Sequence, residues 1–418
     1  MQTFFTLDQL ADPKLAVADE ILRKCVHCGF CTATCPTYVL LGDENDSPRG
    51  RIYLMKEMLE QAKPATKEVV THIDRCLSCL SCMTTCPSGV NYMHLVDHAR
   101  EHIEETYRRP LFERLLRHVL AYIMPRPKLF RLSLIVARLV KRATPLTSGR
   151  VKAALDLAPA HLPRPTQIGG PGTYPAQGPR KGRVALLHGC VQSVLAPEIN
   201  ATTIKLLNHL GYDVIVTAGE VCCGSLTHHM GKEQDAKARA RRMIDQWTAA
   251  GADAIVITAS GCGTTIKDYG FLFKDEPTYA EKAKAISAKA KDITEFLATL
   301  ALPQGKGKDR VAYHAACSIQ HGQQIKTIPQ QLLRRAGHEV VEPEDAHLCC
   351  GSAGTYNILQ PELSAQMRDK KVTRLNALQA QVIATGNIGC ITQLQSGSQI
   401  PVRHIVEVLA AAYGIAAI

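Results

Sequence analysis

The 418-residue chain has few aromatic residues and no long uncharged apolar run. Phe, Trp and Tyr make up 5% of it, with a single Trp, so aliphatic side chains must build most of the core. No apolar run approaches the ~18 residues that a transmembrane helix needs. The N-terminal sequence MQTFFTLDQLADPK lacks the basic and apolar segments of a secretory signal peptide. We therefore expect a cytoplasmic chain without a membrane span.

The abundant feature is cysteine, with 16 residues in the chain. A composition of 46% hydrophobic and 21% charged residues is that of a folded protein, and the length suggests two or three domains. A disulfide scaffold suits short secreted chains that lack a core, and structural disulfides do not persist in a reducing cytosol. Metal binding or redox chemistry therefore remains.

The first eight cysteines form two copies of one spacing. CVHCGFCTATCP at 25–36 and CLSCLSCMTTCP at 76–87 both follow C-x2-C-x2-C-x3-C-P. In bacterial two-cluster ferredoxins, three cysteines of such a run hold one [4Fe–4S] cluster and the fourth reaches the other cluster, whereas zinc sites pair C-x2–4-C with a distant second pair. The predicted first ferredoxin set is Cys25, Cys28, Cys31 and Cys86, and the second ferredoxin set is Cys35, Cys76, Cys79 and Cys82.

Between these runs, Ser47 and Pro48 predict the start of a helix through RGRIYLMKEMLEQ, as N-cap and first helical residue. Arg49 and Arg51 lie in its first turn. Their simplest interpretation is that they are solvated; the alternative is that they neutralise anionic clusters.

The other eight cysteines belong to a duplication. Residues 184–262 and 311–390 repeat one another at an offset of 127 or 128 residues, and each copy contains the motif Cys-Cys-Gly. In each copy, buried apolar runs alternate with helical stretches, which predicts an α/β module with cysteines beyond the carboxyl ends of its strands. The predicted strands are Val184–Leu187, Val214–Val216, Ala254–Ile257, Val311–His314, Glu339–Val341 and Val382–Thr385. The predicted helices of the first copy are Ile199–Leu210 and Lys232–Ala250, closed by Gly211 and Gly251.

These cysteines predict one metal site in each of the two CCG modules. Gly224 and Gly351 would give adjacent thiols the backbone freedom to face one site. The alternatives for each site are an iron–sulfur cluster, a zinc ion or no metal. The first CCG set is Cys190, Cys222, Cys223 and Cys262, and the second CCG set is Cys317, Cys349, Cys350 and Cys390. Five nearby histidines could ligate metal or carry protons, or could be ordinary loop residues: His188, His228, His229, His314 and His347.

Taken together, the two ferredoxin runs and two CCG modules make the chain resemble the iron–sulfur subunits of bacterial glycolate oxidase. The likeness includes CVHCGFCTATCPTYVLLGDE, PRGRIYL, TASGCG and HLCCGSAGTY, and the CCG pattern is shared with lactate-utilisation, anaerobic glycerol-3-phosphate dehydrogenase and heterodisulfide reductase subunits. The resemblance implies an electron-transfer subunit whose flavin-containing partner, with FAD, oxidises glycolate to glyoxylate. The expected acceptor is a quinone or another oxidant. No sequence in the chain predicts a flavin site of its own, and we predict no catalytic residue.

One departure from the heterodisulfide reductase relatives concerns a fifth cysteine in each CCG module. Thr265 and Gln393 occupy the positions where those relatives complete a C-x-x-C pair. The departure argues against a five-thiolate cluster and against disulfide reduction in this chain.

The excess of positive over negative charge lies in one segment. The chain has 49 Lys and Arg against 38 Asp and Glu, a net charge of +11, and residues 100–183 hold 17 of the first and 5 of the second, a net charge of +12. Within this segment, apolar and basic residues alternate at helical spacing over 110–142, with breaks at Pro125 and Pro127. The stretch that follows, 158–183, is rich in Pro and Gly. The helical part could lie on an anionic membrane, dock a partner subunit or pack on the core of this chain. Little points to nucleic-acid binding.

We therefore predict an α+β multidomain chain in four parts. These are a ferredoxin-type two-cluster domain (1–100), a basic helical connector with a Pro/Gly linker (101–183), and two α/β CCG modules (184–305 and 306–418). We expect it in the cytoplasm, or peripheral on the cytoplasmic face of the inner membrane. The alternative functions are the equivalent subunit of a D-lactate or glycerol-3-phosphate dehydrogenase, a disulfide reductase, and a zinc scaffold.

Overall fold

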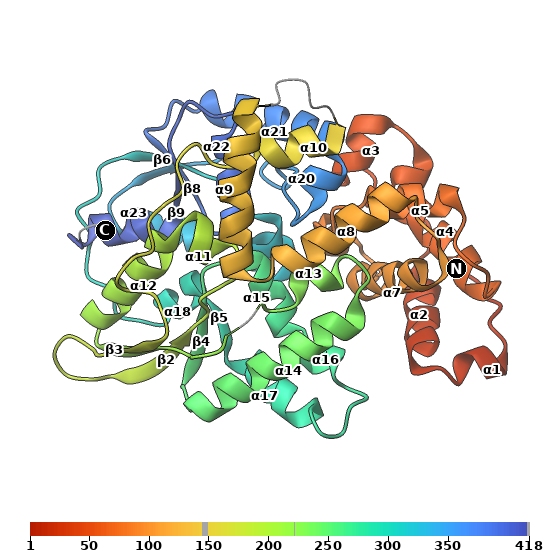
Figure 1. Cartoon of the computed structure of the whole chain (residues 1–418), viewed down its shortest axis with the longest axis horizontal. Coiled ribbons are helices and arrows are strands. Elements are labelled where there is room, and N and C mark those ends of the chain that lie inside the picture. Colours follow the sequence, from red (N-terminus) through yellow and green to blue (C-terminus); the bar gives the residue numbers. More distant parts are fainter. Residues whose placement is uncertain (144–148, 221, 416–418) are drawn as a thin grey trace.

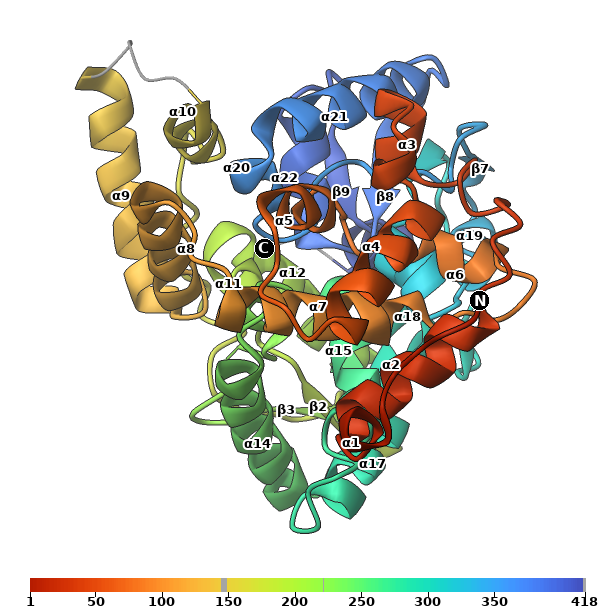
Figure 2. The same ribbon diagram turned by 90° about the vertical axis from the view of Figure 1, so that its right-hand side faces the viewer.

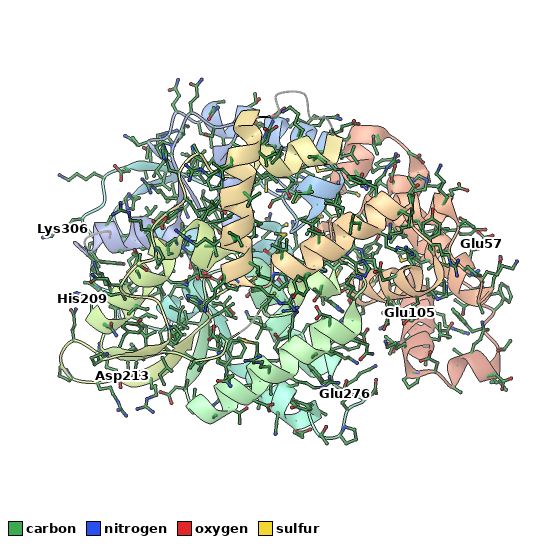
Figure 3. All side chains as sticks on the ribbon, in the orientation of Figure 1. Glu57, Glu105, His209, Asp213, Glu276 and Lys306 are labelled. Atoms are coloured by element: carbon green, nitrogen blue, oxygen red, sulfur yellow. The ribbon has the colours of Figure 1, made fainter. Side chains whose placement is uncertain are left out.

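The computed structural model describes residues 1–143, 149–220 and 222–415. A helical N-terminal part forms one end of the molecule, and two α/β modules with parallel strands form the other (Figure 1). The side chains labelled in Figure 3 mark these ends: Glu57 lies at the helical end and Lys306 at the far end of the second module. The predicted α+β architecture is confirmed.

The N-terminal part packs its helices around a core of aliphatic residues, among them Met55, Leu95 and Ile103. As predicted, Ser47 caps α4 by accepting from the N–H of Gly50, and Pro48 is its first residue. The elements are α1 (Leu7–Leu10), α2 (Pro13–Lys24), α3 (Pro36–Leu41), the 3₁₀ turn η1 (Glu44–Asp46), α4 (Pro48–Glu60), α5 (Lys67–Asp74), α6 (Ser81–Thr85) and α7 (Tyr92–Thr106).

The first module is a five-stranded sheet in the order β1-β3-β2-β4-β5, in which β1 is antiparallel and the other strands are parallel. Its strands are β1 (Gly172–Tyr174), β2 (Gly182–Leu186), β3 (Tyr212–Val216), β4 (Ala254–Ile257) and β5 (Ala290–Asp292). Its helices are α11 (Gln192–Leu195), α12 (Pro197–His209), α13 (Ser225–His228), α14 (Glu233–Ala250), α15 (Ser260–Lys267), α16 (Tyr269–Leu272), α17 (Ala280–Lys289) and α18 (Ile293–Ala298). The predicted strands and helices of this module are confirmed to within a few residues.

The second module repeats the parallel part of that sheet in the order β7-β6-β8-β9. Its elements are β6 (Arg310–Tyr313), the π-helical turn η2 (Ser318–Gly322), α19 (Ile328–Arg335), β7 (Glu339–Val341), α20 (Tyr356–Leu359), α21 (Pro361–Asn376), β8 (Val382–Thr385), α22 (Ile388–Gln395), β9 (Val402–His404) and α23 (Ile405–Ala412).

The two modules pack on one another as a pseudo-symmetric pair. Helix α12 of the first contacts α23 of the second, and the equivalent helices α18 and α19 contact one another in turn. One apolar cluster crosses the boundary and contains Leu206 and Leu297 from the first module with Leu333 and Leu409 from the second. The duplication thus produces one continuous core.

The connector contains α8 (Leu111–Ile123), α9 (Pro127–Ala143) and α10 (Gly149–Asp156). One side of α8 and α9 is buried, at Leu120, Phe130 and Leu134, whereas their opposite side exposes a row of large apolar residues. The two helices cross one face of the molecule in Figure 1 and stand at its edge in Figure 2. Packing on the core of the chain therefore explains only one side of these helices.

The Pro/Gly segment 158–183 is not only an extended linker. It contains β1, which pairs antiparallel with β3, and it ends in the first residues of β2. The prediction missed β1 because a three-residue strand beginning at Gly172 has no apolar alternation to reveal it.

Candidate metal centres

The first ferredoxin set lies together in the structure. Cys25, Cys28, Cys31 and Cys86 line one small cavity, which also touches Cys82 of the second set. The loop that carries the first three thiols winds through two left-handed residues, His27 at φ +54° and Gly29 at φ +87°. These turns let closely spaced cysteines face a common centre. Burial raises the pKa of the Cys31 thiol to about 11.

The second ferredoxin set has the same loop geometry. Ser78 and Leu80 are left-handed at the positions that match His27 and Gly29, with φ of +50° and +62°. The N–H of Ser78 donates to Sγ of Cys76 over 3.4 Å. Burial, with the neighbouring thiols, raises the pKa of Cys79 and Cys82 well above the usual range for a thiol.

Arg51 contributes a buried positive charge beside this set. Its guanidinium is 1% exposed, donates to Sγ of Cys35 over 3.7 Å and pairs with Asp46 at 3.2 Å. Burial alone would lower the pKa of Arg51, but the thiols of Cys76 and Cys35 and the Asp46 carboxylate hold it above its ordinary value. The interpretation of Arg51 as a solvated residue is wrong, because tertiary packing closes over the first turn of α4. Arg49 is partly exposed and pairs with Glu44.

Each CCG set also gathers its thiols. In the second set, Sγ of Cys317 lies 3.8 Å from Sγ of Cys349, and Sγ of Cys350 lies 3.5 Å from Sγ of Cys390. In the first set, hydrogen bonds from Cys190 and Cys223 lower the pKa of the Cys222 thiol well below its usual value. Gly224 and Gly351 are left-handed, with φ of +89° and +86°. A Cβ at Gly224 would meet the backbone of α14 at 2.8 Å, and one at Gly351 would meet the backbone of α21 at 2.6 Å.

Both CCG sets open onto a single cavity of about 240 Å³ between the two modules and the N-terminal part. The cavity is mostly apolar, and Arg100 and Arg117 lie in its wall with Cys76 of the second ferredoxin set. All eight CCG cysteines line it: Cys190, Cys222, Cys223, Cys262, Cys317, Cys349, Cys350 and Cys390. The sequence predicts two separate CCG sites but not this convergence, which results from the packing of the two modules.

The second ferredoxin set adjoins the second CCG set. Cys79 packs against Cys317 and Cys349 in one apolar cluster with Leu77 and Tyr356. The hydroxyl of Tyr356 also donates to the carbonyl of Arg75 over 3.0 Å, across the same boundary. The thiols of two sites that are distant in sequence are thus neighbours in the folded chain.

Thr84 and His321 hold the same boundary through a hydrogen bond of 2.7 Å. On the first module, His228 and His229 face Asp97 of α7, at 3.3 Å and 3.5 Å. Burial would raise the pKa of Asp97, but these two histidines hold it well below its usual value. His228 and His229 therefore join the N-terminal part to the first module, a structural role that the sequence does not reveal.

The other three candidate histidines differ in setting. Burial lowers the pKa of His188, and its backbone N–H donates to the Glu220 carboxylate over 2.8 Å. His347 is part-exposed, and its carbonyl accepts from His321. His314 is 1% exposed and lies against the second CCG set.

The chemistry of the four sets fits iron–sulfur clusters or metal ions. Each set offers four thiols, which are buried or half-buried except for the exposed Cys28, and as bare thiolates they would repel one another. A cationic centre stabilises such a set, since thiolates are the ligands of both iron–sulfur clusters and structural zinc. The spacing of the cysteines predicts these four sets. The sequence offers Arg51 only as an alternative partner of a cluster, and it gives no signal for Asp46 or Arg100, whose places are seen only in the fold.

Buried polar side chains occupy the two positions at which the heterodisulfide reductase relatives have a fifth cysteine. Gln393 is buried and donates to the hydroxyl of Ser364 over 2.8 Å, and Thr265 is almost fully buried in α15. Gln393 thus has a structural role of its own.

Comparison with known families agrees with this layout. Residues 21–90 match the family described as a 4Fe-4S dicluster domain, and residues 184–267 and 311–395 each match the family described as a cysteine-rich domain, CCG.

Two relatives extend over almost the whole chain. The glycolate oxidase iron-sulfur subunit of Escherichia coli (strain K12) is 43% identical over 98% of each chain. The probable glycolate oxidase iron-sulfur subunit of Bacillus subtilis (strain 168) is 32% identical over 94% of each. Lactate utilization protein A of an Exiguobacterium species is 31% identical but matches 54% of this chain and 96% of its own length.

Among solved structures, a hypothetical protein from Helicobacter pylori has a TM-score of 0.59 at 9% identity, covering 96% of this chain and 73% of that one. This likeness shows a common fold.

Proposed function

Because the chain belongs to the family of glycolate oxidase iron-sulfur subunits, we propose that it carries electrons away from a flavin-containing partner that oxidises glycolate to glyoxylate. The partner holds FAD, and this chain holds two [4Fe–4S] clusters on its ferredoxin sets. The two CCG sets hold further iron–sulfur centres or zinc. No residue of this chain is assigned to the chemistry of glycolate itself.

One observation carries this proposal: the partly buried Cys79 and Cys317 both pack against the buried cluster that contains Cys349. When bound, iron–sulfur clusters accept and release single electrons. The chain's own contribution is to hold a ferredoxin set and a CCG set against one another and to exclude water between them. Tyr356 supports this arrangement, because it packs beside the thiols and bonds to the backbone of Arg75.

The four-part division of the chain remains our proposal for its domains. Residues 1–100 and 101–183 would provide the ferredoxin sets and the connector, and residues 184–305 and 306–418 the two CCG modules. Helix α7 continues past residue 100 to Thr106, and β1 joins the connector to the first sheet.

The final acceptor is proposed to be a membrane quinone, reached from the cytoplasmic face of the inner membrane. No described helix is long and apolar enough to cross a bilayer. The exposed apolar side of α8 and α9, here named the connector face, suits a bilayer surface instead. It consists of Leu111, Phe112, Leu115, Val119, Tyr122, Leu129, Leu132, Ile135, Val136 and Leu139.

The charge around the connector face favours anionic lipid as its occupant. Arg114 and Lys128 are exposed on the same two helices. Glu113, the acidic residue in residues 111–143, is turned inward to Arg109 at 2.7 Å and Arg117 at 3.3 Å. A basic rim around an apolar surface matches anionic headgroups above acyl chains.

The experiment that tests the electron-transfer function is reduction of the anaerobically purified complex with its flavin partner. We expect at least about eight irons per chain. We also expect glycolate to reduce the clusters, which rapid mixing with EPR detection would measure. D-lactate and glycerol 3-phosphate in the same assay test the related dehydrogenases. A colourless protein that contains zinc alone would overturn the proposal.

Gln393 argues against a disulfide reductase function, because it replaces the fifth cysteine and its amide donates to the Ser364 hydroxyl. A heterodisulfide substrate in the same assay tests it, and we expect no turnover.

A further inference from the structure

The two CCG sites differ in one buried side chain. His314 follows β6 and is 1% exposed, with neither ring nitrogen hydrogen-bonded within the part of the chain that the structure describes. A buried imidazole without a partner is costly, since each polar nitrogen loses its contact with water. Such a group requires an explanation.

The surroundings of His314 supply one. A ring nitrogen of His314 and the Sγ atoms of Cys350 and Cys390 all lie within 4.8 Å of one another. At bond lengths of about 2.0–2.3 Å, two ligands of one tetrahedral metal ion are separated by roughly 3.3–3.8 Å. The three donor atoms are therefore close to the spacing at which they can meet at one metal.

The first module lacks this donor. At the cysteine offset of 127 residues, the counterpart of His314 is Leu187, which is buried in an apolar cluster with Cys223. A second difference lies beside it. Lys371 of α21 is buried, and its counterpart at the offset of 128 residues, which aligns Cys390 with Cys262, is Met243.

The ammonium of Lys371 is held by the Asp345 carboxylate at 3.2 Å. Metals bind the neutral form of an imidazole, which keeps a nitrogen lone pair.

We infer that His314 is a metal ligand of the second CCG site, together with Cys350 and Cys390, and that the first CCG site is bound by thiolates alone. This inference rests on the proposed iron–sulfur function. Imidazole is a good ligand for iron, and histidine replaces cysteine on one iron of Rieske clusters. The two repeats would thus hold chemically different centres.

The test uses the holoprotein prepared anaerobically, with ¹⁵N-histidine or natural-abundance histidine. Pulsed EPR of the reduced protein should show a nitrogen coupled strongly enough to be bound to iron, with the isotope pattern of histidine. The same signal should vanish in His314→Leu, which installs the residue of the first module. His347→Leu, a histidine change beside the same cysteines, should retain it.

A second measurement follows the release of iron to a chelator. Loss of a direct ligand should speed release from one centre by at least the roughly tenfold that loss of an outer-shell partner causes. His314→Gln provides this comparison if the leucine variant does not fold. Full iron content with no histidine coupling in the unaltered protein would overturn the inference while leaving the electron-transfer function intact. A protein without iron would instead overturn that function.

Discussion

The guanidinium of Arg51 donates to Sγ of Cys35 across 3.7 Å, in an interior where Arg51 itself is 1% exposed. The same guanidinium donates to the hydroxyl of Thr37 over 3.0 Å and to the carbonyl of His72 over 2.7 Å. A fixed positive charge is thus held against a proposed cluster ligand. Hydrogen bonds to sulfur and net charge set the reduction potential of such clusters.

Replacing Arg51 by Met should lower the reduction potential of the cluster on the second ferredoxin set. The reduced cluster carries more negative charge, so it loses more stabilisation than the oxidised one. A hydrogen bond to a charged group contributes about 1.5–3 kcal/mol, which corresponds to a shift of about 60–130 mV for one electron. Redox titration followed by EPR measures it.

Arg49→Met is the matched control for that experiment. Arg49 lies two residues earlier, pairs with Glu44 and lines the cavity of the first ferredoxin set, so its removal should shift the potential of the second cluster far less. Equal shifts in both variants would contradict a specific role for the buried guanidinium.

The second prediction tests whether the fourth cysteine of each ferredoxin run binds the cluster of the other run. Cys86→Ala should remove the same EPR signal as Cys28→Ala, because Cys86 lines the cavity of Cys25, Cys28 and Cys31. Cys35→Ala should instead act like Cys79→Ala, since Cys35 is close enough to Cys79 for its charge to help raise the pKa of the Cys79 thiol. Iron content should fall by up to about four per chain in each case.

The pairing of signals decides this second prediction. If Cys86→Ala altered the signal that Cys79→Ala removes, each run would hold its own cluster and the exchange would be wrong.

The sequence predicted those features that depend on short-range pattern. The spacing around Cys25 and Cys76 predicted the cysteine sets, the Ser47–Pro48 pair predicted the start of α4, and apolar runs predicted the central strands. Each of these is decided by residues within about a dozen positions.

What the sequence could not predict depends on contacts between distant segments. Arg51 has the local pattern of an exposed first-turn residue, and only the approach of α5 and the Cys76 loop buries it. The strands β1, β5 and β9 gain their pairing from neighbouring strands, and unlike β7, which is equally short, none of them lies in a segment that the duplication marks as a strand. The shared cavity of the two CCG sets likewise exists only after the modules pack together.

The connector face makes a third prediction. The triple variant Leu115→Ser, Leu132→Ser and Leu139→Ser should bind vesicles that contain anionic lipid at least about 100-fold more weakly than the parent, because burial of each leucine contributes about 1.5–3 kcal/mol when complete. These side chains are 63%, 56% and 63% exposed, so the change should leave the fold intact. Vesicle flotation measures binding.

Leu7→Ser provides the control, since Leu7 is 87% exposed but lies on α1, away from the connector face. Binding of the parent should also weaken with salt and be lost on zwitterionic vesicles. If the triple variant bound lipid normally but no longer bound the flavin partner, the face would be a subunit interface and the lipid assignment would be wrong.

The last prediction concerns His404, which joins the two modules. Its Nε2 donates to the carbonyl of Thr258 over 2.7 Å, and its Nδ1 accepts from the N–H of Val406 over 3.1 Å at the start of α23. Only the neutral ring can make both bonds. Burial accordingly lowers the pKa of His404 to about 4.

The consequence is a loss of stability in acid. The unfolded chain binds this proton near pH 6.5 and the folded chain near pH 4, so the contribution of His404 is complete above pH 6.5 and falls as pH drops toward 4. Between pH 7.5 and 5.5 the loss should be about 1.4 kcal/mol. His404→Asn should be less stable at pH 7.5 yet lack this part of the pH dependence, as measured by denaturant unfolding at both pH values.

Replacing the exposed His209 by Asn is the control, and it should leave the pH dependence of stability unchanged. If stability fell as steeply with pH in His404→Asn as in the parent, the acid sensitivity would belong to other groups.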